Sequence, residues 1–197
     1  PWHIPQLLVD PAGEWQKRAS AKGPLIVTGM RGCGKTMLLR SLQFHARAMQ
    51  AGEETEAQVI NRLRDDGFVG LFVSAQILVE STDEPETPNS KLFARLLLAY
   101  ALEASRALAH LKDINDELVS AQAPKLIADA LLSLLSNFEV DVPGNSIERF
   151  EHTLVRKLLE VSKPENQCRL DIHPSKAFPA LANAISQCSR TCKSTLL

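Results

Sequence analysis

Apolar and polar positions in the first third of the chain follow the order strand, helix, helix, strand. Residues 24–28 are apolar and partly β-branched, which is typical of a buried strand. Residues 35–50 have a helical pattern that ends at a glycine, Gly52. Residues 53–66 predict a second, more polar helix that ends at Gly67. Residues 68–73 are nearly all apolar, as expected for a parallel strand that is covered on both faces.

The rest of the chain is mainly helical in pattern. Helices are predicted over residues 90–111, 124–138, 146–162 and 179–193. Ser146 lies three residues before Arg149 and is suited to an N-cap, and Pro179 is suited to the first turn of the last helix. Residues 74–80 are a candidate extension of the second strand, and residues 81–89 predict an acidic, proline-containing loop. We also expect a short helix near the N-terminus, over residues 14–21.

The turn between the first strand and the first helix matches G-x-x-x-x-G-K-[ST], the motif of a phosphate-binding loop. The motif consists of Gly29, Met30, Arg31, Gly32, Cys33, Gly34, Lys35 and Thr36, and Met37 follows it. Glycines let backbone amides wrap around phosphates, and a helix N-terminus adds the positive end of its dipole. We therefore expect residues 29–37 to bind ATP. Lys35 is expected to act as the catalytic cation on the β- and γ-phosphates, and Thr36 to ligate Mg²⁺.

These elements predict an α/β fold, with a partial P-loop parallel sheet and a large helical region. We expect a lead-in segment at residues 1–23, a nucleotide-binding core at residues 24–80, and a helical insertion or second region at residues 81–197. The chain begins with Pro1 and not with methionine, so we expect it to be part of a longer protein.

A P-loop ATPase also needs an acidic residue on another strand, which orients the Mg²⁺ shell. Two weak candidates are Asp141 and Asp171, but a charged residue, Glu139 or Arg169, interrupts the strand pattern before each. The alternative is that the acidic strand lies outside this chain. Residues 141–144 also spell the D-x-x-G motif of GTPases, although Asp-x-Pro-Gly is a common turn sequence and no guanine-reading motif follows.

The four cysteines allow two further interpretations. Cys168, Cys188 and Cys192 form a zinc set with His173, but the spacing does not match paired Cys-x-x-Cys knuckles, so ordinary thiols are the alternative. Cys33 lies beside Lys35 at a helix N-terminus, where a thiol pKa falls, which raises the hypothesis of redox control. Sparse cysteines fit a reducing cytosol, and we expect a cytoplasmic protein.

Charge and hydropathy narrow the range of partners. The formal net charge is −1, which gives no electrostatic support for nucleic acid or for an anionic membrane as a partner. The longest apolar stretches are interrupted by charged residues, so no membrane span is expected, and we find no signal peptide.

The motif and its flanks resemble the AAA+ and STAND group of P-loop ATPases. The resemblance lies in Val27-Thr28-Gly29-Met30-Arg31-Gly32-Cys33-Gly34-Lys35-Thr36-Met37-Leu38-Leu39-Arg40. Together with the strand at residues 67–73, it is similar to bacterial ATPases of the origin-recognition branch, and it covers residues 24 to about 75. The resemblance implies a nucleotide-driven conformational or assembly switch with a protein partner or a second copy, in a defence or DNA-associated system.

Two other functions stay open. A small-molecule P-loop kinase fits the length of 197 residues, but it needs an arginine-rich lid, and the arginines here are scattered along predicted helices. A nucleotide-sensing scaffold that binds ATP without hydrolysis fits the weak acidic candidates. In the full-length protein we expect hydrolysis of ATP to ADP and phosphate. Arg31 either faces the phosphates or a neighbouring subunit, or is a solvated loop cation.

Overall fold

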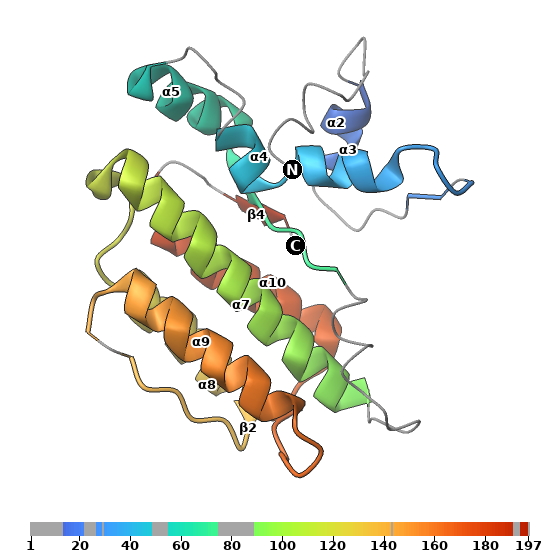
Figure 1. The fold of residues 1–197 in the computed structure, drawn as a ribbon, viewed down its shortest axis with the longest axis vertical. Helices are drawn as coiled ribbons and strands as arrows, with labels where there is room; N and C mark the ends of the chain where they lie inside the picture. The colour runs from blue at the N-terminus through green and yellow to red at the C-terminus, as the bar shows by residue number, and fades with distance from the viewer. Residues whose placement is uncertain are drawn as a thin grey trace.

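The computed structural model describes residues 14–21, 27–28, 30–48, 55–74, 89–142, 144–190 and 194–196. Its elements follow the order drawn in Figure 1. They are α2 (Glu14–Ala19), α3 (Lys35–Ser41), α4 (Phe44–Ala48), α5 (Glu56–Asp66), β1 (Phe68–Gly70), α7 (Asn89–Ile114), the 3-10 turn η1 (Asp116–Leu118), α8 (Ala123–Leu134), β2 (Leu135–Ser136), α9 (Ile147–Ser162), β3 (Arg169–Leu170), α10 (Pro174–Cys188) and β4 (Ser194–Leu196).

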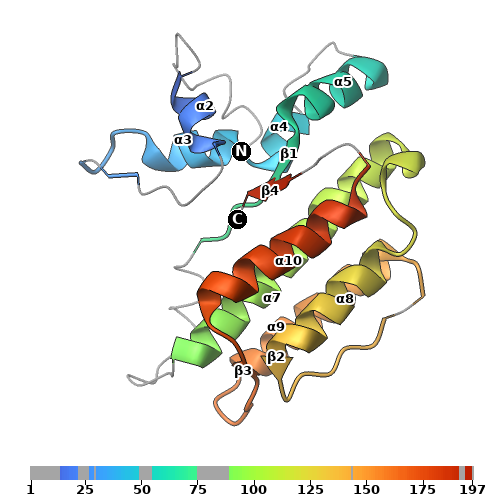
Figure 2. The ribbon, with the colours of Figure 1, turned by 180° about the vertical axis from the view of Figure 1, so that it is seen from behind.

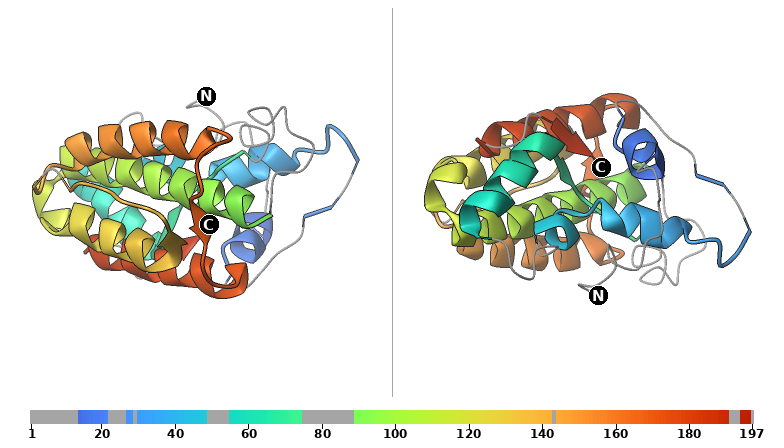
Figure 3. Two further views of the ribbon diagram at one scale, coloured as in Figure 1. Left: turned by 90° about the horizontal axis from the view of Figure 1, so that it is seen from below. Right: turned by 90° about the horizontal axis from the view of Figure 1, so that it is seen from above.

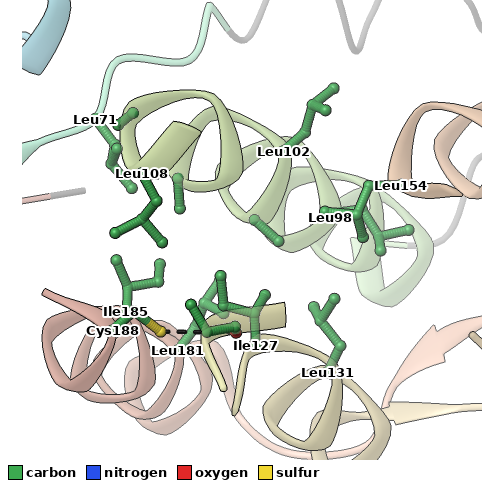
Figure 4. Packing of buried hydrophobic residues seen from close by; sticks show 14 of the residues in the cluster. Leu71, Leu98, Leu102, Leu108, Ile127, Leu131, Leu154, Leu181, Ile185 and Cys188 are labelled. Atoms are coloured by element: carbon green, nitrogen blue, oxygen red, sulfur yellow. Dashed lines mark hydrogen bonds between the residues drawn. The ribbon is translucent and has the colours of Figure 1, made fainter. Parts of the chain in front are cut away.

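Helices α7 to α10 pack side by side as a bundle and contain most of the residues in the described helices (Figure 1). Alanines along α7, among them Ala94, Ala101 and Ala104, are completely buried and let the neighbouring helices approach closely. Leucines and isoleucines from all four helices meet between them, including Leu98, Ile127, Leu154 and Leu181 (Figure 4). The predicted large helical region is therefore confirmed.

The described strands form two pairs. β1 pairs with β4 in parallel, with Phe68 opposite Ser194, and this pair lies between α10 and the helices of the N-terminal part (Figure 2). β2 pairs with β3 in antiparallel orientation at the lower end of the bundle (Figure 2). A P-loop sheet of several parallel strands is thus not among the described residues. In the first predicted strand, Val27 and Thr28 have no strand structure, and residues 24–26 lie outside the description.

The prediction of one continuous helix over residues 35–50 is wrong. α3 ends at Ser41 and α4 begins at Phe44, and the amides between them bond three residues back, from Leu42 to Leu39 and from Gln43 to Arg40. The break is explained by packing against β1. A Cβ atom added to Gly70 would lie 1.9 Å from the carbonyl oxygen of Leu42, so the two backbones are in direct contact.

The second predicted helix and strand are largely confirmed. Thr55 and Gln58 form a complete capping box at the start of α5, and Gly67 ends the helix with φ of 70°. β1 is shorter than predicted, because only residues 68–70 pair with β4. Most of the predicted strand extension, the predicted loop up to residue 88, and residues 49–50 and 53–54 lie outside the description.

The later helices agree in number, but not all in their bounds. α9 begins after Ser146, whose hydroxyl accepts the amide of Arg149 as predicted. α8 ends at Leu134, because the next two residues pair with β3. α10 begins at Pro174, five residues before the predicted start, with the side chain of His173 as its N-cap, so Pro179 lies inside the helix.

Candidate functional site

Two glycines shape the turn before α3. Gly32 and Gly34 have φ of 88° and 84°, and Gly34 is the residue directly before the helix. A Cβ atom at either position would meet no described atom within 4 Å. Glycine is therefore favoured here by the left-handed backbone and not by crowding, as a loop that wraps a ligand with its backbone requires.

The turn is open to solvent on its outer side. Residues 30–33 are exposed, and Met30 at the tip is 85% exposed. Thr36 is also exposed, whereas Gly34, Lys35 and Met37 are half-buried. Gly29 lies outside the described residues. The hydroxyl of Thr36 is thus accessible at the start of α3, where helix amides lack intrahelical acceptors.

The ammonium group of Lys35 lies within the turn. Its Nζ atom donates to the carbonyl oxygen of Met30 at 2.8 Å and contacts the Sγ atom of Cys33 at 3.3 Å. The amide of Cys33 also bonds to Met30, at 3.4 Å. The structure therefore brings three of the predicted site residues together and places a positive charge inside the turn, close to its backbone.

Helix α3 is anchored on the side away from the turn. Leu38 and Ser41 are buried, and the hydroxyl of Ser41 donates to the carbonyl of Leu38. The guanidinium of Arg40 lies 5.3 Å from the ring centroid of Phe72, just after β1. The helix that carries Lys35 and Thr36 is thereby attached to the segment after the next strand.

An ion pair that the sequence analysis missed supports this region. Arg47 on α4 forms two hydrogen bonds with the carboxylate of Asp66 on α5, and both side chains are largely buried. The guanidinium of Arg62 donates to the carbonyl oxygen of Arg47 at 2.7 Å. No local sequence pattern pairs residues this far apart. The one hint of an ion pair is Arg47 itself, a charged residue between the buried alanines of α4.

The two weak candidates for the acidic residue do not lie on strands beside the turn. Glu139 and Asp141 are exposed in an irregular segment after β2. Asp171 follows β3 at the lower end of the bundle, whereas α3 lies at its upper side (Figure 2). Gly144 has φ of 62° and its amide bonds to Val142, which supports the turn interpretation of the D-x-x-G sequence.

The described cysteines of the zinc set behave as buried thiols. Burial raises the pKa of Cys168 to about 11 and the pKa of Cys188 to about 12. The Cys188 thiol donates to carbonyl oxygens of Ala184 and Ala123 (Figure 4). Cys192 lies outside the description, and the described residues contain no group of three metal-binding side chains. These observations favour the thiol interpretation over zinc.

Helix α7 is the longest in the described part of the chain, and neither it nor any other described helix combines the length and apolar character that a membrane span requires.

Comparison with known proteins adds one match. A family model with the description ORC-CDC6-like matches residues 1–194, which is nearly the whole chain. No curated protein and no solved structure shows a significant match. The match agrees with the resemblance of the motif to AAA+ ATPases of the origin-recognition branch.

Proposed function

Because this chain belongs to the ORC-CDC6-like family, we propose that it is an ATP-binding domain whose nucleotide state drives a conformational or assembly switch. The observation that carries the proposal is the turn before α3. It combines two left-handed glycines, the start of a helix and an ammonium group held against the backbone. This combination suits a polyphosphate, because amide donors and a positive charge converge on one small volume.

Each residue of the turn has a role in this proposal. Gly29 to Gly34 would surround the phosphates with backbone amides, and Met37 would follow at the first turn of α3. Lys35 would exchange its bond to the Met30 carbonyl for the β- and γ-phosphates, and Thr36 would ligate Mg²⁺. Arg31 is exposed beside these groups, where it would face a phosphate or a neighbouring subunit. The nucleotide and Mg²⁺ would supply the phosphoryl chemistry.

The link from the turn to the rest of the molecule supports a switch. α3 is separated from α4 by only two residues, and α4 packs against both α5 and α7. A group bound at the start of α3 therefore has a short, packed route to the helical bundle. We propose that residues 24–80 form the nucleotide-binding core and that the helical region at residues 81–197 contacts a protein partner or a second copy.

Our proposal for the biological system in which the chain acts rests on family membership alone. Membership of the ORC-CDC6-like family supports a DNA-associated assembly or a related defence system, and the STAND-type switch is the corresponding mechanism.

The variant Lys35→Ala tests the proposal directly. Removal of a charged hydrogen-bond donor from a phosphate site weakens Mg·ATP binding by about tenfold or more. Calorimetry on the full chain measures this, with Lys125→Ala as the matched control, because Lys125 is exposed on α8. Equal ATP affinity in the wild-type chain and in Lys35→Ala would contradict the assignment of the turn.

Phosphate release in the same samples separates the alternatives. Release without an acceptor supports an ATPase, whereas binding without turnover favours a nucleotide-sensing scaffold. Turnover that requires a small-molecule acceptor favours a P-loop kinase. A parallel titration with GTP tests the preference for ATP.

A further inference from the structure

Three aromatic rings join α4 to α7. The ring centroids of Phe44 and His45 on α4 each lie close to that of His110 on α7, at 6.0 Å and 5.4 Å. Phe44 is only 2% exposed, and both imidazoles are half-buried. Two titratable rings are therefore part of the contact that holds α4 on the bundle.

The charged groups around this contact come from several helices. On α7, Arg106 lies one turn before His110 and bonds to Glu103 at 2.6 Å and to Glu151 of α9 at 3.0 Å. On the other side of α4, Arg47 holds the carboxylate of Asp66 from α5. The carboxylates in these networks are thus already engaged with arginines, so they offer little compensation for a new positive charge.

The environment of His45 opposes a positive charge on its ring. Burial lowers the pKa of His45 most, and His110 and then Arg106 lower it further, while Glu151 acts weakly in the opposite direction. A histidine with a lowered pKa in the packed state binds a proton more readily once it is released from the contact. Acid therefore favours the state in which α4 has separated from α7.

We propose that the Phe44–His45–His110 contact is an acid-sensitive joint between α4 and the bundle. Protonation at this contact loosens α4, and with it α3, which begins at the turn with Lys35. The sign follows from linkage: the contact is fully stable above pH 6.5, the ordinary pKa of histidine, and weakens as the pH falls below that value. The joint is a property of the chain without nucleotide, so it does not depend on the proposed function.

Hydrogen exchange of the α4 amides tests the joint. Protection factors of the full chain are measured at pH 7.5 and pH 5.5 and corrected for the intrinsic pH dependence of exchange. In the wild-type chain we expect the opening constant of α4 to rise by up to about tenfold at the lower pH, the limit for one histidine that stays neutral when packed. The double variant His45→Gln/His110→Gln, which cannot titrate at this contact, should lose this pH dependence.

The control is His152→Gln, because His152 is exposed on α9 and its ring is not one of the three in the contact. It should keep the pH dependence of the wild-type chain. Equal protection of wild-type α4 at both pH values would overturn the proposal, and so would a double variant with the full wild-type pH dependence.

A second measurement needs no variant. The imidazole of His45 is titrated in the wild-type chain by NMR, and a midpoint below pH 6.5 supports the joint. A midpoint at or above pH 6.5 overturns the proposal. This measurement decides the question even if circular dichroism shows that the double variant does not fold.

Discussion

Three glycines in the N-terminal part are required for two different reasons. Gly32 and Gly34 are required for their backbone angles, whereas Gly70 is required for space. The sequence motif identifies Gly34 by its spacing, whereas Gly32 stands at one of the variable positions of the motif. Gly70 lies in an apolar run where a glycine has no periodic meaning, and only the contact with Leu42 explains it.

The variant Gly70→Ala should therefore destabilise the chain. Its Cβ atom would overlap the carbonyl oxygen of Leu42, so β1 or the α3–α4 junction must shift, at a cost of about 1–3 kcal/mol in the free energy of unfolding. Urea denaturation measures the change. Gly144→Ala is a useful comparison, since the added Cβ at position 144 meets no described atom and only the backbone is strained. A Gly70→Ala chain as stable as the wild type would mean that the close contact does not exist.

At the scale of elements, two basic side chains of α7 bind the C-terminal end of α9. Lys91 donates to the carbonyl oxygens of Lys163 and Pro164, at 2.8 and 2.9 Å. Arg95 is 1% exposed and donates to Ser162 at 2.6 Å, but its Nε and Nη1 atoms have no partner among the described residues. Burial correspondingly lowers the pKa of Arg95. Lys91 is therefore well satisfied, and Arg95 is only partly so.

We therefore expect replacement by methionine to lower the free energy of unfolding more at Lys91 than at Arg95. Lys91→Met loses two hydrogen bonds to helix-end carbonyls and should cost about 1–3 kcal/mol of unfolding free energy. Arg95→Met loses one bond but also removes a buried, incompletely paired guanidinium, so its cost should be smaller. Thermal or urea unfolding of the two variants gives the order. A larger loss for Arg95→Met would show that its guanidinium has further partners in solution.

The helices also show which features can be predicted from local sequence patterns and which cannot. The cap at Ser146 and the box at Thr55 and Gln58 are local features. The predicted bounds of α9 and the predicted last residue of α5 agree with the structure, although α5 begins at Glu56 and not at residue 53. The break after Ser41 and the early end of α8 depend on pairing with distant segments, β1 and β3, that no local pattern encodes. The predicted start of α10 is wrong because histidine, at position 173, is an unusual N-cap, and because Pro174 and Pro179 are both suited to the first turn of a helix.

At the scale of the whole molecule, the bundle and the turn before α3 differ in their exposure to solvent. Cys168 and Cys188 are completely buried in the bundle core, whereas Cys33 is exposed in the turn. The motif was readable from sequence because it is contiguous. The core was only partly readable, because helical patterns indicate buried faces but not which faces meet.

Thiol labelling should report this difference. In a Cys192→Ser chain, iodoacetamide at pH 8 should modify Cys33 rapidly, while Cys168 and Cys188 stay unmodified until the bundle unfolds. Their pKa values of about 11 and 12 leave almost no thiolate at this pH, in addition to the burial that blocks access. Mass spectrometry of peptides measures the sites. Rapid modification of Cys188 in the native chain would contradict the packing drawn in Figure 4.

The parallel pairing of β1 with β4 has a consequence for synthesis on the ribosome. Phe68 emerges early, but its partner Ser194 emerges only after all four bundle helices. In the right view of Figure 3, β4, drawn in red, lies beside teal segments from the first half of the chain. Among the described strands, β1 pairs only with β4, so during translation it waits for this partner while the more local contacts of the bundle form first. β1 is consequently fixed only after the bundle helices have been made, and a chaperone has a long time to act there.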